Sequence, residues 1–186
     1  MMRLRVFSPA VAVLALLLTT ATGARAQETA LLRWGGDAEG GAPFVSADPR
    51  DATEVIGFEA DIAALLAAEL GRTPRFVQSG FTTLDAAVLR GDFDVILSGI
   101  EDLPVRRARL ALTVPYYEFE ERLTVRTPDA GRYRTLADLR GRRVGTLAAT
   151  LAAGVLAEAE SAHGIVPVLY EDDVHPYDDL ALGRLD

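Results

Sequence analysis

The chain has 186 residues, a formal net charge of −8 and no cysteine. Its 49% hydrophobic and 25% charged residues are typical of a globular protein, which excludes a disordered or fibrous chain. The lack of cysteine excludes a disulfide framework and thiolate metal sites, and the acidic balance argues against a nucleic-acid partner.

Residues 1–26 have the pattern of a secretory signal peptide. Two arginines precede an apolar run at residues 6–18, and a small-x-small cleavage site ends at Ala26. The run is shorter than the roughly 20 residues that span a bilayer, which argues against an uncleaved anchor. We therefore expect cleavage after Ala26 and a periplasmic protein.

Short apolar runs and amphipathic helical patterns alternate after residue 27. Strands are expected at 31–34, 75–78 and 94–97, and helices at 57–71 and 83–90. This β-α-β-α-β order predicts a mainly parallel sheet with helices on both faces. The carboxyl ends of such strands share one edge, where ligands bind. The candidate binding loops are 37–44, 79–82 and 98–106.

The clearest helix is the one at residues 57–71. It places five apolar residues on one stripe and stops at Gly71, a natural residue for the end of a helix. The stripe consists of Phe58, Ile62, Leu65, Leu66 and Leu70.

A second, smaller α/β pattern follows an extended segment at residues 114–125. Its expected elements are a helix at 135–141, a strand at 144–147, a helix at 150–163, a strand at 166–170 and a short helix at 177–182. The run at 171–179 is rich in acidic residues but lacks calcium-loop spacing, so we expect a solvated loop without a metal.

The stretch DVILSGIEDLPVRR, at residues 94–107, joins a buried strand to opposed charges. Ser98 and Gly99 could offer a hydroxyl and a close backbone approach to a ligand at the strand end. Pro104 suits the first turn of a helix, and Arg106 could hold a carboxylate by two charge-assisted hydrogen bonds. The alternative is a solvated helix face on which Arg106, Arg107 and Arg109 pair with Glu101 and Asp102.

Several segments together resemble the periplasmic amino-acid solute-binding proteins of ABC transporters, known as bacterial extracellular solute-binding protein family 3. They are GFEADIAALLAAELG, FVQSGFTTLDAAVLRGDFDVILSGIEDLPVRR, VPYYEFEERLTV, LADLRGRRVGTL and DLALGRLD. The resemblance implies an α/β, two-lobed clamshell of the type II periplasmic-binding-protein class. It also implies a monomeric receptor that delivers an amino acid to an ABC transporter permease, without cofactor, metal or catalysis.

The resemblance also implies a set of ligand-binding residues. Arg106 matches the arginine that holds the ligand α-carboxylate, Phe81 an aromatic packed on the ligand side chain, and Asp37 an acid that meets its distal polar group. Ser98 and Gly99 match strand-end positions, and Thr150 a hydroxyl-bearing helix start. With Glu101, the candidate set is Asp37, Phe81, Ser98, Gly99, Glu101, Arg106 and Thr150.

Two positions depart from the family pattern within the candidate site. Gly41-Ala42 replaces an aromatic that usually forms one wall of the pocket, and Glu101 stands where a small hydroxyl residue is common. Glu101 and Asp37 would make the cleft acidic and favour a cationic or amine-bearing amino acid. The alternative is an internal pair of Glu101 with Arg106 or Arg107.

The sequence ends before the second-lobe strand that in the family holds the ligand ammonium, so we expect an incomplete, C-terminally truncated second lobe. The expected division is a signal peptide at 1–26, lobe 1 at 27–120, a hinge crossing at 121–127 and a partial lobe 2 at 128–186. Two other functions stay open. One is a secreted enzyme resembling cyclohexadienyl dehydratase, with Glu101 as its acid, and the other is the sensing module of a larger receptor.

Overall fold

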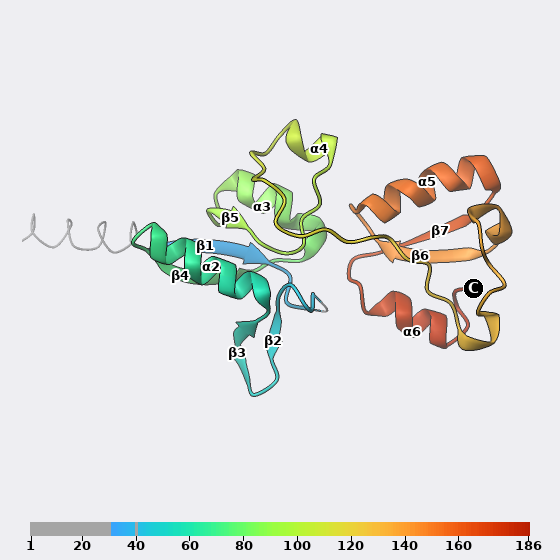
Figure 1. The fold of residues 1–186 in the computed structure, drawn as a ribbon, viewed down its shortest axis with the longest axis horizontal. Helices are drawn as coiled ribbons and strands as arrows, with labels where there is room; N and C mark the ends of the chain where they lie inside the picture. Colours follow the sequence, from blue (N-terminus) through green and yellow to red (C-terminus); the bar gives the residue numbers. More distant parts are fainter. Residues whose placement is uncertain (1–30, 40) are drawn as a thin grey trace, which may run out of the picture.

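A computed structural model describes residues 31–39 and 41–186, so the signal-peptide prediction lies outside the described residues. The elements gather in two lobes joined by an extended segment (Figure 1). One lobe runs from β1 (Leu31–Gly36) to α4 (Pro104–Arg107), and the other from β6 (Arg143–Leu147) to α6 (His175–Ala181). No helix among the described residues is both long and apolar enough to cross a membrane. The boundaries at residues 120 and 127 stay a proposal.

The first lobe is built on a three-stranded parallel sheet in the order β4-β1-β5. Its strands are β1 (Leu31–Gly36), β4 (Thr73–Gln78) and β5 (Val95–Ile96), and its connecting helices are α2 (Phe58–Glu69) and α3 (Leu84–Arg90). A 3-10 turn, η1 (Phe81–Thr83), precedes α3, and the short helix α4 (Pro104–Arg107) follows β5. The predicted β-α-β-α-β order is therefore confirmed, although β5 is shorter than expected.

Apolar clusters pack around the sheet. Trp34, Val45, Ala63 and Leu97 form one cluster, and Phe81, Leu84, Ala87 and Phe93 form another. At Gly35, the second-last residue of β1, an added Cβ would lie 2.4 Å from the Phe93 ring. Only glycine lets this aromatic ring pack so closely against the strand.

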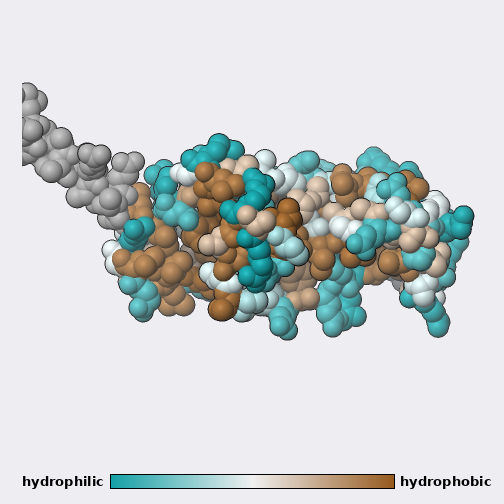
Figure 2. Space-filling model, turned by 90° about the horizontal axis from the view of Figure 1, so that it is seen from above, coloured by the Kyte–Doolittle hydropathy of each residue, from teal (hydrophilic) through white to brown (hydrophobic). Residues whose placement is uncertain are grey.

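Helix α2 is confirmed, but its apolar stripe is only partly buried, with Ile62 packed against the core cluster of Trp34. Leu65 and Leu70 are 69% and 54% exposed, whereas Glu59, Ala63 and Ala67 are buried. Two small alanines allow the helix to approach the strands closely, so packing rather than hydrophobicity selects this face. Figure 2 shows hydrophobic residues interspersed with polar ones on the surface.

An antiparallel hairpin between β1 and α2 was not predicted. It consists of β2 (Ser46–Asp48) and β3 (Asp51–Ile56). Most of β3 is exposed, so its sequence carries no apolar alternation. At the turn, the Arg50 backbone N–H donates to the Asp48 carboxylate at 2.8 Å.

The second lobe contains a parallel pair of strands and its connecting helix. These are β6 (Arg143–Leu147), α5 (Leu151–His163) and β7 (Val166–Tyr170), followed by α6 (His175–Ala181). The helix expected at 135–141 is a short 3-10 helix, η3 (Leu136–Leu139), and another 3-10 turn, η2 (Thr127–Asp129), precedes it. Leu139, Ala159 and Ile165 form the core of this lobe.

Candidate functional site: an acidic cleft between the lobes

A cavity of about 800 Å³ lies between the two lobes. The three loops predicted from the strand ends all reach it, because parallel strands end at one edge of the sheet. From these loops it is lined by Asp37, Glu39, Gly41, Phe44, Phe81, Ser98, Gly99 and Glu101. The extended segment and the second lobe supply the rest, including Glu121, Arg122, Arg134, Thr150, Asp172, Asp173 and Asp186.

Carboxylates outnumber guanidinium groups along the cavity wall. Burial raises the pKa of Asp173, and the nearby charges of Asp172 and Asp37 raise it further. Both arginines of the wall, Arg122 and Arg134, are exposed. The resulting negative potential favours the binding of a positively charged ligand.

Asp37 holds the strand ends together. Its carboxylate accepts hydrogen bonds from Gln78 Nε2 at 3.0 Å, the Phe81 N–H at 2.9 Å and the Glu39 N–H at 3.0 Å. Its own N–H donates to Ser98 Oγ at 3.0 Å. These bonds link the ends of β1, β4 and β5, and a carboxylate with about four acceptor positions keeps capacity for one more donor in the cavity.

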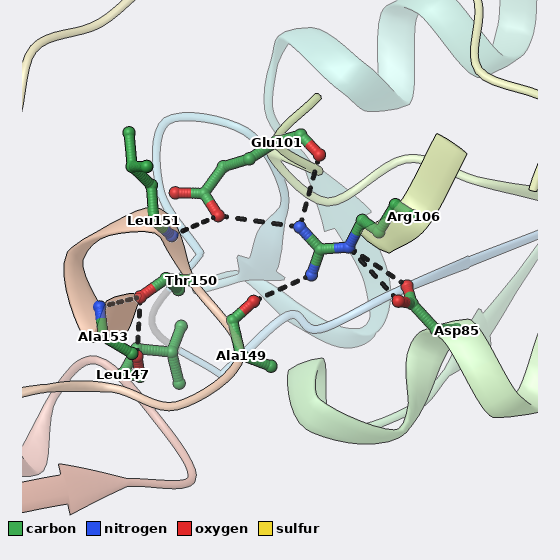
Figure 3. A network of polar contacts seen from close by, with 8 residues as sticks. All are labelled: Asp85, Glu101, Arg106, Leu147, Ala149, Thr150, Leu151 and Ala153. Carbon is green, nitrogen blue, oxygen red and sulfur yellow. Dashed lines mark hydrogen bonds and ion pairs between the residues drawn. The ribbon is translucent and has the colours of Figure 1, made fainter. Parts of the chain in front are cut away.

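Arg106 is buried between the lobes, with 3% of its side chain exposed (Figure 3). Its Nε donates to both oxygens of Asp85 at 3.3 and 3.2 Å, and its Nη2 donates to the Ala149 carbonyl at 3.0 Å across the cleft. Its guanidinium carbon lies 5.7 Å from the centre of the Phe81 ring. Arg106 therefore faces inward, although it is not among the residues that line the cavity.

Glu101 also bridges the lobes. Its Oε2 lies 3.5 Å from Arg106 Nη1 and accepts a hydrogen bond from the Leu151 N–H at 2.8 Å (Figure 3). Burial raises the pKa of Glu101, while the Leu151 N–H and the Arg106 charge oppose that rise. The structure thus contains the internal Glu101–Arg106 pair that the sequence left as an alternative. Arg107 pairs instead with Asp102.

Thr150 caps helix α5. Its hydroxyl accepts a hydrogen bond from the Ala153 N–H at 3.2 Å and donates to the Leu147 carbonyl at 2.7 Å. The preceding residue, Ala149, has a left-handed φ of 61°, a strained conformation for a residue with a side chain. In this turn the Ala149 carbonyl accepts a hydrogen bond from Arg106 Nη2.

Sequence reasoning missed a buried acid beneath the cleft. Glu59, in the first turn of α2, is fully buried and accepts the Gly99 N–H at 2.9 Å and the Tyr116 hydroxyl at 2.5 Å. Burial raises its pKa, against the effect of these two donors. Glu59 thus ties the Gly99 strand end to the extended interlobe segment. The sequence does contain a signal for this buried acid, because Glu59 follows directly after Phe58, the first residue of the apolar stripe.

An aromatic cluster forms another part of the interlobe region. Phe44 lines the cavity and packs against Phe58 at 5.1 Å and Tyr117 at 5.5 Å between ring centres. Tyr116 and Tyr117 are absent from the cavity wall and pack on Phe58. Phe44 and Phe81 are the aromatic side chains that the strand-end loops bring to the cavity.

Comparison with known proteins gives consistent results. Residues 32–164 match the profile of the bacterial extracellular solute-binding proteins, family 3. A histidine-binding periplasmic protein of Salmonella typhimurium is 30% identical over 93% of this chain and 65% of its own length. ABC transporter arginine-binding protein 1 of Escherichia coli is 29% identical over 72% of this chain and 53% of its own length.

Solved structures with the same two-lobed fold align over most of the chain. A periplasmic binding protein of Salmonella typhimurium with high arginine specificity has a TM-score of 0.71 and 28% identity, covering 83% of this chain and 66% of that protein. An ancestral amino acid-binding protein, a precursor of cyclohexadienyl dehydratase, has a TM-score of 0.78 and 25% identity, covering 86% and 69%. The chain spans about half to two thirds of the curated relatives cited.

Proposed function

The chain belongs to the bacterial extracellular solute-binding proteins of family 3, and we propose that it is a receptor for a polar, cationic amino acid. On this proposal the chain is exported by a cleaved signal peptide and works in the periplasm as a monomer. It delivers its ligand to the permease of an ABC transporter. The names of the relatives, which are arginine- and histidine-binding proteins, support this assignment.

The observation that carries the proposal is the acidic interlobe cavity. Its volume of about 800 Å³ suits a small solute, and carboxylates from both lobes surround the space. A bound cation would be attracted from both sides, and closure of the lobes around it would remove water and strengthen this attraction. Phe44 and Phe81 provide apolar surface for the aliphatic part of a ligand.

The proposed roles of the candidate residues follow from their positions. Asp37, Glu101 and Asp173 provide negative charge, and Ser98 and Gly99 form the strand-end wall. Phe81 contacts the ligand. Thr150 caps the start of α5 at the cavity wall. Arg106 joins the two lobes through its hydrogen bond to the Ala149 carbonyl.

Titration calorimetry of the purified protein tests this function. We expect saturable binding of at least one of arginine, lysine, ornithine and histidine, and none of aspartate or glutamate. Asp173→Asn should weaken binding about tenfold, because one half-buried charge is lost from the cavity wall. Asp61→Asn removes an exposed carboxylate of α2 outside the cavity and is the matched control. Preference for acidic ligands, or no binding at all, would refute the proposal.

We also propose that the chain binds its solute without transforming it. The structural neighbour related to cyclohexadienyl dehydratase is itself an amino acid-binding protein. Incubation with prephenate or arogenate should therefore yield no aromatic product, and formation of phenylpyruvate or phenylalanine would favour the enzyme instead.

A further inference from the structure

The positive groups best placed to hold a ligand carboxylate already hold a carboxylate of the chain itself. Arg106 and the first N–H of helix α5 both approach the same oxygen, Glu101 Oε2, at 3.5 and 2.8 Å (Figure 3). A guanidinium and a helix N-terminus together form a strong anion site. In this structure Glu101 fills that site from within.

The rest of the Arg106 guanidinium is also occupied. Its Nε bonds to Asp85, its Nη2 to the Ala149 carbonyl at 3.0 Å, and its Nη1 also to the Glu101 carbonyl at 3.3 Å. A ligand carboxylate would have to displace Glu101, which is 9% exposed and is held beside Arg106 by the chain. Such tethering gives Glu101 a high effective concentration and makes it a strong competitor.

Other positive groups along the described cavity wall are poor substitutes. Arg122 is 80% exposed and pairs with Glu120, and the exposed Arg134 donates to the Gly131 carbonyl at 3.3 Å. The carboxylates of the wall, in contrast, can receive positive groups from a ligand. The cleft thus offers carboxylates that can bind a cation, while Glu101 occupies the anion site formed by Arg106 and the start of α5.

We propose that Glu101 is a specificity-determining residue that makes the cleft prefer amines and guanidines lacking a carboxylate over the corresponding α-amino acids. This inference rests on the proposed function, namely that the acidic cleft binds cationic amino acids, which then remain ligands but bind more weakly than the corresponding amines and guanidines. The inference narrows the preferred ligands to amines and guanidines that correspond to cationic amino acids without their carboxylate. The anionic group that the ligand lacks is supplied by the receptor.

The test compares arginine with agmatine by titration calorimetry on the purified protein, because the two ligands differ only in the carboxylate. Wild-type protein should bind agmatine at least about tenfold more tightly than arginine. Glu101→Ser empties the anion site, so arginine should gain affinity and agmatine should lose it. The agmatine-to-arginine affinity ratio should fall by about tenfold or more. If Glu101→Ser does not fold, Glu101→Gln keeps the size of the side chain and removes its charge.

Glu121→Gln is the matched control. Glu121 lines the same cavity and interacts electrostatically with Glu101, but it contacts neither Arg106 nor Leu151 in any described hydrogen bond. Because Glu121 is exposed, its substitution should change the agmatine-to-arginine affinity ratio much less than the Glu101 variants do. An unchanged ratio in the Glu101 variants, or tighter arginine than agmatine in the wild type, overturns the inference while the proposed function stands. Binding of neither compound by the folded wild type overturns the inference, and the proposed function is refuted as well only if lysine, ornithine and histidine also fail to bind.

Discussion

Replacing Arg106 by methionine should destabilise the fold strongly. The substitution keeps an unbranched chain of similar length but removes the guanidinium that joins the two lobes. It leaves Asp85 and Glu101 without their positive partner and the Ala149 carbonyl without its donor. The energetic consequence depends on how well water can replace these lost bonds.

The magnitude follows from the exposure of the three groups. Removing one member of a buried ion pair costs about 3–5 kcal/mol when its partner stays buried and charged. Glu101 meets this condition, since 9% of its side chain is exposed. Asp85 is 31% exposed, so water recovers part of its loss. We therefore expect Arg106→Met to lower the free energy of unfolding by about 2–4 kcal/mol.

Equilibrium unfolding in urea measures this change, followed by circular dichroism. The neighbouring Arg107→Met is the control, because Arg107 lies on the same short helix, is exposed, and pairs with Asp102 at the surface. It should unfold at nearly the wild-type urea concentration. Adding Glu101→Gln to Arg106→Met should recover part of the stability by removing an unpaired buried charge. Equal unfolding midpoints for the two arginine variants would refute the reasoning.

Two further predictions concern Glu59 and the glycines. Burial raises the pKa of Glu59 above 4.5, so its destabilising contribution is fully present above the raised pKa and is lost as the pH falls through it toward 4.5. The unfolding free energy of the wild type relative to Glu59→Gln should therefore rise as the pH is lowered from about neutral, and a pH-independent difference would contradict this. In urea unfolding, Gly154→Ala should stabilise by about 0.5–1 kcal/mol, because nothing lies within 4 Å of the added Cβ in α5. Gly35→Ala should destabilise by about 1–3 kcal/mol, because its Cβ would lie 2.4 Å from the Phe93 ring, and a similar effect at both glycines would exclude this packing argument.

Much of the fold was predictable because its signals are local. The helix at α2 and its end at Gly71, which has a φ of 64°, follow from apolar spacing and from the freedom of glycine. The hairpin of β2 and β3 was missed because exposed strands have no apolar alternation to read. The apolar stripe of α2 did not show which of its residues are most buried, because the small residues Ala63 and Ala67 are buried more completely than the leucines.

For the candidate site, the sequence determined which loops meet at the cleft. The rule that parallel strands end at one edge placed Asp37, Phe81 and Ser98 together, and the structure has all of them on the cavity wall. The same rule says nothing about which side chains pair once the loops have met.

Only the tertiary structure decided the partners of the charged groups. Arg106 bonds to Asp85, 21 positions earlier, and to the Ala149 carbonyl, 43 positions later, and no local pattern relates these residues. Glu101 could have paired with Arg106 or Arg107, or only with a ligand in the cavity. Its position on the Leu151 N–H at the start of α5 follows from how the second lobe sits on the first. Composition set the sign of charge in the cleft, but the choice among possible ion pairs depends on distances that exist only when both lobes are folded.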